Sequence, residues 1–309
     1  MNECDVVVIG GGAAGLSAAL VLTRARRRVT VVDAGRPRNA PAAHMQGFLG
    51  SDGMPPSELV AAARAEVAGY GGRFVAATAR GIAPGDASGA ADRRIFDIAL
   101  DDGSTLRARR ILVATGLRDE IPQLPGVRER WGRDLLHCPY CHGYEVRDQP
   151  LGVLGGTPEA VAHAHLVRQW SQDVVLFTDG TLDDDDQHRR LATRGIGVRD
   201  GRVERLVVEH DRLTGVQLAS GETVTRSAVF VRPRFVPHDS LLTGLGCATA
   251  AGGWVVVDPT GRTSTAGNVV NPRAQVITAA GEGSAAAIDI NNDLVEDDIS
   301  TALAATVLG

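Results

Sequence analysis

The chain has 309 residues, of which 32 are basic and 37 acidic, so its formal net charge is −5. Every basic residue is arginine, which excludes a Schiff-base lysine, a pyridoxal phosphate site and a P-loop NTPase. The acidic balance argues against a nucleic-acid groove, and no apolar run approaches the roughly 18 residues of a membrane helix. Abundant glycine favours tight strand-to-helix turns. We therefore expect a cytoplasmic α/β protein with no nucleic-acid or membrane partner.

A dinucleotide-binding pattern opens the chain. The apolar run 6–9 predicts a strand, which leads into Gly10, Gly12 and Gly15 in the G-x-G-x-x-G spacing, and then into an alanine-rich helix. The next predicted strand ends at Asp33, 18 residues after the third glycine, where an acid accepts hydrogen bonds from a ribose. The glycines let the backbone approach a pyrophosphate at the start of the helix. This pattern predicts a bound dinucleotide.

Alternation of strand and helix signals continues along the chain. Paired strands are expected between residues 73 and 114, separated by a glycine-rich loop that begins at Gly85. A second β-α-β unit is expected over 151–177. Further strand-like segments lie at 205–209, 228–232 and 253–258, and a final helix is expected from about Gly283. The sequence thus predicts an α/β fold with two Rossmann-like, three-layer ββα domains. One domain is expected over 1–116 and 239–309, and the inserted one over 117–238.

The stretch from His137 to Glu145 contains the most informative motif, a Cys-x-x-Cys formed by Cys138 and Cys141. Two thiols at this spacing at a helix start favour a reactive redox pair. His137 and His142 flank them and could move protons near neutral pH. Three other interpretations are a structural zinc site, c-type haem attachment and buried unreactive cysteines. No second ligand pair accompanies the motif, so we expect no metal.

Together these motifs resemble the low-molecular-weight thioredoxin reductase family of FAD-dependent disulfide oxidoreductases, over nearly the whole length. The resemblance also includes Ala114-Thr115-Gly116 and the segment from Ala266 to Gly281. It implies FAD as cofactor and a homodimer. The residues that it and the glycine motif assign to FAD are Gly10, Gly12, Ala14, Gly15, Asp33, Asn39, His44, Ala114, Thr115, Gly116, Asn268, Gln275 and Val276.

The second β-α-β unit departs from the NADPH-binding pattern of that family. Thr157 stands at the middle glycine, and Glu159 adds negative charge where phosphates are expected. The following strand leads into the acidic run 183–186 instead of the arginines that recognise a 2′-phosphate. His188-Arg189-Arg190 comes 11 residues after Phe177, which predicts a helix face. We therefore expect a degenerate nucleotide site, with a displaced phosphate site as the alternative.

The redox motif, Cys-Pro-Tyr-Cys-His-Gly-Tyr-Glu, more closely resembles dithiol oxidases that close disulfides in natural products such as gliotoxin and holomycin. This resemblance implies electron flow from a small-molecule dithiol through the cysteine pair to FAD and then to O2, giving H2O2. It implies substrate attack on Cys138, with Cys141 facing the flavin. His142 is the first candidate base and His137 the second. The alternatives are an NADPH-dependent thioredoxin reductase, a reductase using another donor such as ferredoxin, and a flavin-bound redox sensor.

Overall fold

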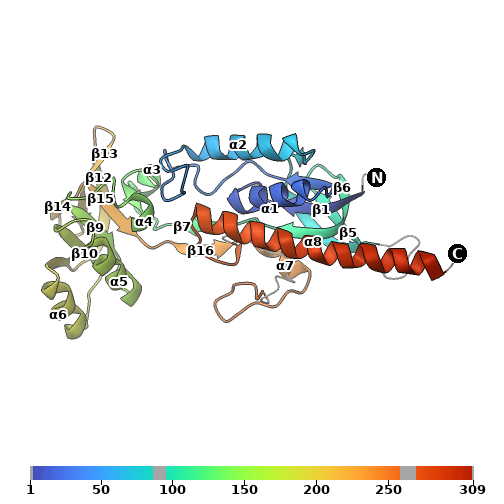
Figure 1. Cartoon of the computed structure of the whole chain (residues 1–309). Coiled ribbons are helices and arrows are strands. Elements are labelled where there is room, and N and C mark those ends of the chain that lie inside the picture. The colour runs from blue at the N-terminus through green and yellow to red at the C-terminus, as the bar shows by residue number, and fades with distance from the viewer. Residues whose placement is uncertain (1–2, 86–94, 258–268, 308–309) are drawn as a thin grey trace.

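The computed structural model describes residues 3–85, 95–257 and 269–307. Figure 1 shows an elongated molecule with one sheet at the end that holds the chain termini and another at the opposite end. Strands β7 (Leu117–Glu120) and β16 (Arg234–Pro237) lie between them. The α/β fold with two Rossmann-like sheets confirms the predicted fold class.

The first sheet has six strands in the order β3-β2-β1-β6-β5-β4. Strand β1 lies at its centre and is buried at six of its seven positions, as expected for a strand covered on both faces. Strands β1, β2, β3 and β6 run parallel, while β5 and β4 add an antiparallel edge. The bounds are β1 (Glu3–Ile9), β2 (Val29–Val32), β3 (Arg73–Val75), β4 (Ala79–Gly85), β5 (Ile95–Leu100) and β6 (Thr105–Val113).

Four helices accompany this sheet in sequence: α1 (Ala13–Arg24), α2 (Pro56–Gly69), α7 (Ser240–Gly244) and α8 (Val276–Val307). Helix α8 runs alongside α1 and extends past it toward the C-terminus (Figure 1). Gly283 packs tightly against α1, since an added Cβ would lie 2.0 Å from the carbonyl oxygen of Ala14. Helix α8 has 32 residues. Neither α8 nor any other helix in the described residues is long and apolar enough to span a bilayer.

The second sheet is fully parallel and has the order β11-β10-β9-β15-β8. A three-stranded antiparallel sheet, β12-β13-β14, lies beside it (Figure 1). The strands are β8 (Leu135–Leu136), β9 (Leu151–Leu154), β10 (Val174–Phe177), β11 (Ile196–Arg199), β12 (Val203–Glu209), β13 (Arg212–Leu218), β14 (Thr223–Thr225) and β15 (Ala228–Val231). The helices are α3 (Val127–Arg130), α4 (Pro139–His142), α5 (Pro158–Val167) and α6 (Asp185–Thr193).

Strands β7 and β16 pair antiparallel and carry the chain to and from the second sheet. The predicted inserted segment, 117–238, begins in β7 and ends one residue after β16. We propose on this basis that 117–238 forms one domain and that 1–116 with 239–309 forms the other.

Three details differ from the prediction. Helix α8 begins at Val276, seven residues before the expected Gly283, because this glycine serves close helix packing and not helix initiation. Residues 254–257 form no strand and contribute only an isolated bridge from Val255 to Thr249. Strand β4 was not separately expected. The predicted loop after Gly85 and the cofactor residue Asn268 lie outside the described residues.

Candidate active site

The turn between β1 and α1 has the geometry of a phosphate cradle. Gly10 has φ +109°, and an added Cβ would lie 2.3 Å from the carbonyl oxygen of Ala114. A Cβ on Gly15 would lie 1.9 Å from the carbonyl oxygen of Gly10, so helix and strand touch there. Gly12, by contrast, faces open space and is the N-cap of α1, without a side-chain cap. The first N–H groups of α1, which carries Ala14, are therefore available to an anion.

Asp33 lies directly after β2, beside this turn. A Cβ on Gly11 would lie 2.6 Å from its carboxylate. The Asp33 carboxylate accepts hydrogen bonds from the backbone N–H of Gly35 and from Arg64, both at 3.3 Å. The acid thus borders the cradle, as a ribose-binding acid must.

The segment Ala114-Thr115-Gly116 follows β6 at the same edge of the sheet. The Thr115 hydroxyl donates to the carbonyl of His238 at 2.6 Å, and the backbone N–H of His238 donates to the carbonyl of Gly116 at 2.9 Å. These bonds tie the end of β6 to the residue following β16.

Cys138 and Cys141 form a disulfide. Cys138 is the N-cap of α4, and its sulfur accepts a hydrogen bond from the backbone N–H of Cys141 at 3.2 Å. Pro139, at the first position of α4, has the backbone angle that a helix start requires. Both cysteines are partly exposed, so the disulfide can be reached from solvent.

Gln275 joins this disulfide to the first sheet's helices. It directly precedes Val276, the first residue of α8, and its Nε2 lies 3.9 Å from Cys141 Sγ. Gly47, in the loop after β2, lies near the Gln275 side chain, since a Cβ added to Gly47 would lie 4.0 Å from Gln275 Oε1. The sequence pattern assigns Gln275 to the flavin alone and does not predict its contact with the disulfide.

The two flanking histidines have different surroundings. The ring of His137 stacks on Trp131 with centroids 5.6 Å apart, and meets Phe235 edge to face. Arg38 Nη2 lies 3.4 Å from His137 Nε2, which must accept because arginine only donates. Burial, helped by the charge of Arg38, lowers the pKa of His137 to about 4. His137 is thus neutral near pH 7, and Arg38 occupies one of its nitrogens.

The ring of His142 makes no hydrogen bond with any residue in the described part of the chain. Burial lowers the pKa of His142, while the charge of Glu145 opposes this shift. A partly exposed, neutral imidazole with both nitrogens available can accept a proton.

A group of residues around His137 is not predicted by the sequence. Arg38 makes a two-bond ion pair with Asp119, at 2.8 and 2.7 Å, and its guanidinium lies over Phe235. Asp119 and Phe235 are themselves paired across the β7–β16 ribbon. No local signal marks these residues, because the contact joins positions 81 apart in the chain.

Asn39 and His44 lie in the loop after β2. His44 is exposed, and its Nδ1 donates to the carbonyl of Gly53 at 3.0 Å, which closes the loop on itself. Asn39 takes part through its backbone carbonyl, which accepts from Ala42. Neither side chain contacts the disulfide in the described residues, so their assignment to FAD remains a prediction.

Among residues 3–85, 95–257 and 269–307, no group of histidine, cysteine and acidic side chains is arranged to hold a metal ion. The site instead combines a phosphate cradle, a ribose-binding acid, a helix start beside the cysteines and a disulfide. Gly12 leaves the space that a pyrophosphate would fill, so these residues fit FAD.

This combination defines a flavin-dependent disulfide oxidoreductase. Residues 4–283 match the family model described as pyridine nucleotide-disulphide oxidoreductase, and the chain belongs to this family of FAD-binding flavoproteins.

Individual relatives agree with this assignment. The chain is 30% identical over 320 residues to thioredoxin reductase sirT of Leptosphaeria maculans, with 96% of both chains covered. It superposes on the crystal structure of HlmI with a TM-score of 0.94 and 56% identity, covering 99% of this chain and 96% of that one. The structure of an oxidoreductase from Agrobacterium tumefaciens matches with a TM-score of 0.87 and 35% identity, covering 95% and 99%. Matches to three other curated relatives span only about half of their length, at 45%, 56% and 57%.

Proposed function

We propose that this protein is an FAD-dependent dithiol oxidase. It forms an intramolecular disulfide in a small-molecule dithiol of the holomycin type, and dioxygen is the final acceptor. The observation that carries this proposal is the carboxyl edge of the second sheet. There, Thr157 and Asp184 cap the helix starts at which the phosphates of a pyridine nucleotide would bind, and the disulfide lies beside Gln275 at the start of α8.

The first turn at this edge is capped internally. Thr157 is the N-cap of α5, and its hydroxyl accepts from the backbone N–H of Ala160 at 3.3 Å. Hydrogen bonds lower the pKa of the next acid, Glu159, so that it remains anionic beside the helix start. A phosphate approaching α5 would meet a threonine side chain and a carboxylate, both of which oppose its binding.

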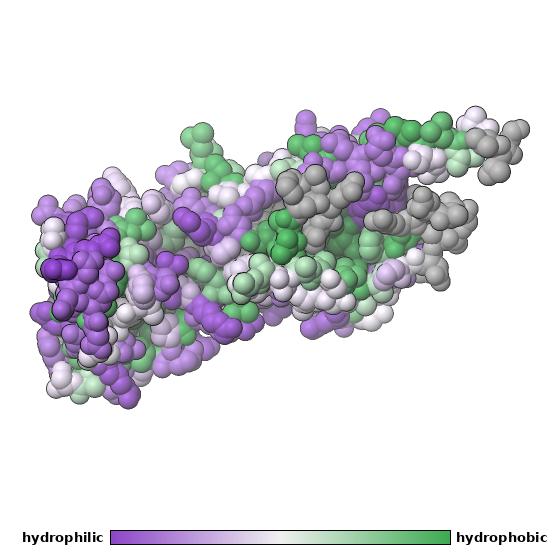
Figure 2. All heavy atoms as spheres, turned by 90° about the horizontal axis from the view of Figure 1, so that it is seen from below, coloured by the Kyte–Doolittle hydropathy of each residue, from purple (hydrophilic) through white to green (hydrophobic). Residues whose placement is uncertain are grey.

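The second turn is also capped by the chain's own side chains. Asp184, within the predicted acidic run, caps α6 by accepting from the backbone N–H groups of Asp186 and Gln187. Arg189 lies on α6, as predicted for a helix face, and pairs with Asp186 at 3.2 Å. Figure 2 shows a strongly hydrophilic surface at the end of the molecule that carries α6. The acids thus have a structural role in starting the helix.

The redox motif and its relatives support the same direction of electron flow. Its Cys-Pro-Tyr-Cys-His sequence resembles that of the natural-product dithiol oxidases. The likeness to HlmI extends over nearly the whole chain, and the likeness to sirT covers 96% of it.

The proposed chemistry begins with a substrate thiolate attacking Cys138 Sγ. The Cys138–Cys141 bond breaks, Cys141 leaves as a thiolate, and a mixed disulfide forms between the substrate and Cys138. The second substrate thiolate then attacks the substrate sulfur of that mixed disulfide. A cyclic disulfide leaves and Cys138 is released as a thiolate, so the substrate has lost two electrons and the cysteine pair has gained them.

Bound FAD would supply the two-electron redox chemistry that connects the cysteine pair to dioxygen, and the hydrogen peroxide formed would carry the two protons lost by the substrate thiols. The chain would hold this cofactor at the glycine turn, Asp33 and the start of α8. Gln275, between α8 and Cys141, orients the sulfur that faces it and donates a hydrogen bond to its thiolate.

His142 is the proposed base for the substrate thiol. It is neutral near pH 7, and its ring has no hydrogen-bond partner among the described residues. His137 is restrained by Trp131 and Arg38, so we assign it a positioning role.

We also propose a homodimer. Helix α8 exposes Ile288, Val295, Ile299 and Leu303, spaced by seven, four and four residues, which places them along one face. Apolar surface is visible on the projecting end of α8 in Figure 2. Sedimentation velocity should show a dimer that Ile299→Arg dissociates, while Val208→Arg, an exposed control on β12, leaves it intact.

Cys4 and Cys247 carry free thiols, which fits a reducing compartment such as the cytoplasm.

Anaerobic mixing tests the proposed function. The yellow holoenzyme is combined with dithiothreitol or with reduced holomycin, and separately with NADPH, while flavin absorbance is followed. Bleaching by dithiol, with recovery in air, is expected. Rapid bleaching by NADPH instead would identify the protein as a pyridine-nucleotide-dependent reductase.

A further inference from the structure

A groove opens beside β7 and α3, and its lining includes Asp119 and Trp131 from the group of residues around His137. It consists of two adjoining cavities of about 260 and 580 Å³. Ile121, Gln123 and Arg128 line both, so the two form one continuous depression. Cavities of this size hold small organic molecules.

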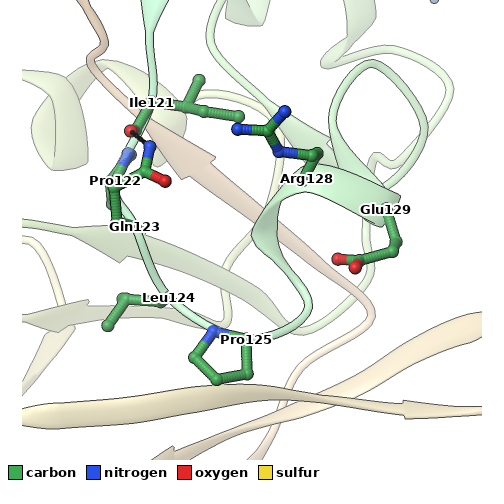
Figure 3. A pocket seen from close by; sticks show the side chains of 7 residues that line it. All are labelled: Ile121, Pro122, Gln123, Leu124, Pro125, Arg128 and Glu129. Atoms are coloured by element: carbon green, nitrogen blue, oxygen red, sulfur yellow. Dashed lines mark hydrogen bonds between the residues drawn. The ribbon is translucent and has the colours of Figure 1, made fainter.

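The groove is lined by apolar side chains such as Ile121 and Trp131, by the acids Asp119, Glu120 and Glu129, and by one cation, Arg128. In Figure 3 the segment from Ile121 to Pro125 forms one wall, and Arg128 and Glu129 enter from α3 opposite it. The Gln123 amide donates to the carbonyl of Ile121 at 3.1 Å. The guanidinium of Arg128 has no hydrogen bond or ion pair with the residues that the structure describes. Arg128 can therefore donate to a carbonyl or other acceptor on a ligand.

Two lining residues connect the groove to the redox centre. Trp131 lines the larger cavity and stacks on His137, the residue before Cys138. Asp119 also lines that cavity and holds Arg38, which contacts the same histidine. A ligand in the groove would thus contact the two side chains that fix the position of His137.

We infer that this groove binds the non-sulfur part of the substrate, an inference that rests on the proposed function. The ligand is a small heterocyclic dithiol whose ring contacts Ile121 and Trp131. A ring carbonyl of that ligand accepts a hydrogen bond from Arg128. The groove would then distinguish such a dithiol from a short open-chain one, which has neither a ring nor a carbonyl.

The test compares two dithiols in the full holoenzyme. Dithiothreitol is the open-chain probe, and reduced holomycin, a bicyclic lactam dithiol, is the ring probe. The measured quantity is the ratio of kcat/KM for the ring probe to that for dithiothreitol. Arg128→Ala should lower this ratio about tenfold, the effect expected for one hydrogen bond to a charged group, mainly through KM.

Matched variants make the outcome specific. Arg133→Ala, a nearby exposed arginine that pairs with Asp211 outside the groove, should leave the ratio unchanged. Arg128→Lys should keep part of the wild-type ratio that Arg128→Ala loses. Trp131→Ala should lower the ratio below the wild-type value, as Arg128→Ala does. If Arg128→Ala leaves the ratio at the wild-type value while both dithiols are oxidised, the groove assignment is wrong and the proposed function stands. If the wild-type enzyme oxidises neither dithiol, both fail.

Discussion

Gln275 Nε2 lies 3.9 Å from Cys141 Sγ, which brings the residue preceding α8 into contact with the redox disulfide. Because we propose that the start of α8 holds FAD, this contact would link the two halves of the proposed electron path. The two sulfurs have different surroundings. Cys141 Sγ lies beside Gln275, and Cys138 is the N-cap of α4.

Gln275→Leu should slow the transfer of electrons from the reduced cysteines. The amide donates to the Cys141 thiolate, and loss of a hydrogen bond to a charged acceptor costs about 1.5–3 kcal/mol, or at least tenfold in rate. Stopped-flow bleaching of the flavin by dithiothreitol measures this rate. Gln217→Leu, which removes a surface amide bonded to Arg205, should bleach at the wild-type rate. An unaltered rate in Gln275→Leu would remove this residue from the electron path.

The two cysteines should be distinguishable by trapping. In Cys141→Ser the remaining Cys138 thiolate opens a cyclic disulfide product, and iodoacetamide added next caps the freed substrate thiol, which would otherwise reclose the ring and release Cys138. Intact-protein mass spectrometry should then show one covalently bound product. Cys138→Ser should show none, because Cys141 is the sulfur that faces Gln275. Equal trapping by both variants would contradict the proposed roles.

Two glycines on α8 should respond in opposite ways to alanine. Gly283→Ala places a Cβ 2.0 Å from the carbonyl oxygen of Ala14, so α8 must move away from α1. We expect about 3 kcal/mol of destabilisation and weaker FAD retention. Gly281→Ala meets nothing within 4 Å and should stabilise the protein by about 0.5–1 kcal/mol. Urea unfolding and flavin release measure both effects. Equal stability of the two variants would contradict the close helix contact.

Stability should fall on acidification between pH 6.5 and about pH 4. Burial lowers the pKa of His137 and of His163 to about 4, from 6.5. In this window the unfolded chain binds protons that the folded chain does not, so the free energy of unfolding decreases as pH falls. The two histidines together contribute on the order of a few kcal/mol. Urea unfolding at pH 7.5 and 5.0 measures the loss, which His163→Gln should reduce. A loss of the same size in the variant would exclude His163 as a source.

Local patterns predicted much of the fold and cofactor cradle. The glycine spacing from Gly10 to Gly15 determines a turn whose geometry depends on few other residues. The same kind of signal failed at Gly283, because a glycine required for helix–helix contact is locally indistinguishable from one that ends or begins a helix. The cluster of Arg38, Asp119 and His137 could not be predicted, because it depends on how separate segments meet in space.

Oxygen consumption tests the central claim most directly. The holoenzyme with a small dithiol should consume one O2 and form one H2O2 per disulfide, without NADPH, and Cys138→Ser should abolish this turnover. Dithiol oxidation that continues at the wild-type rate in Cys138→Ser, or that requires NADPH, would contradict it.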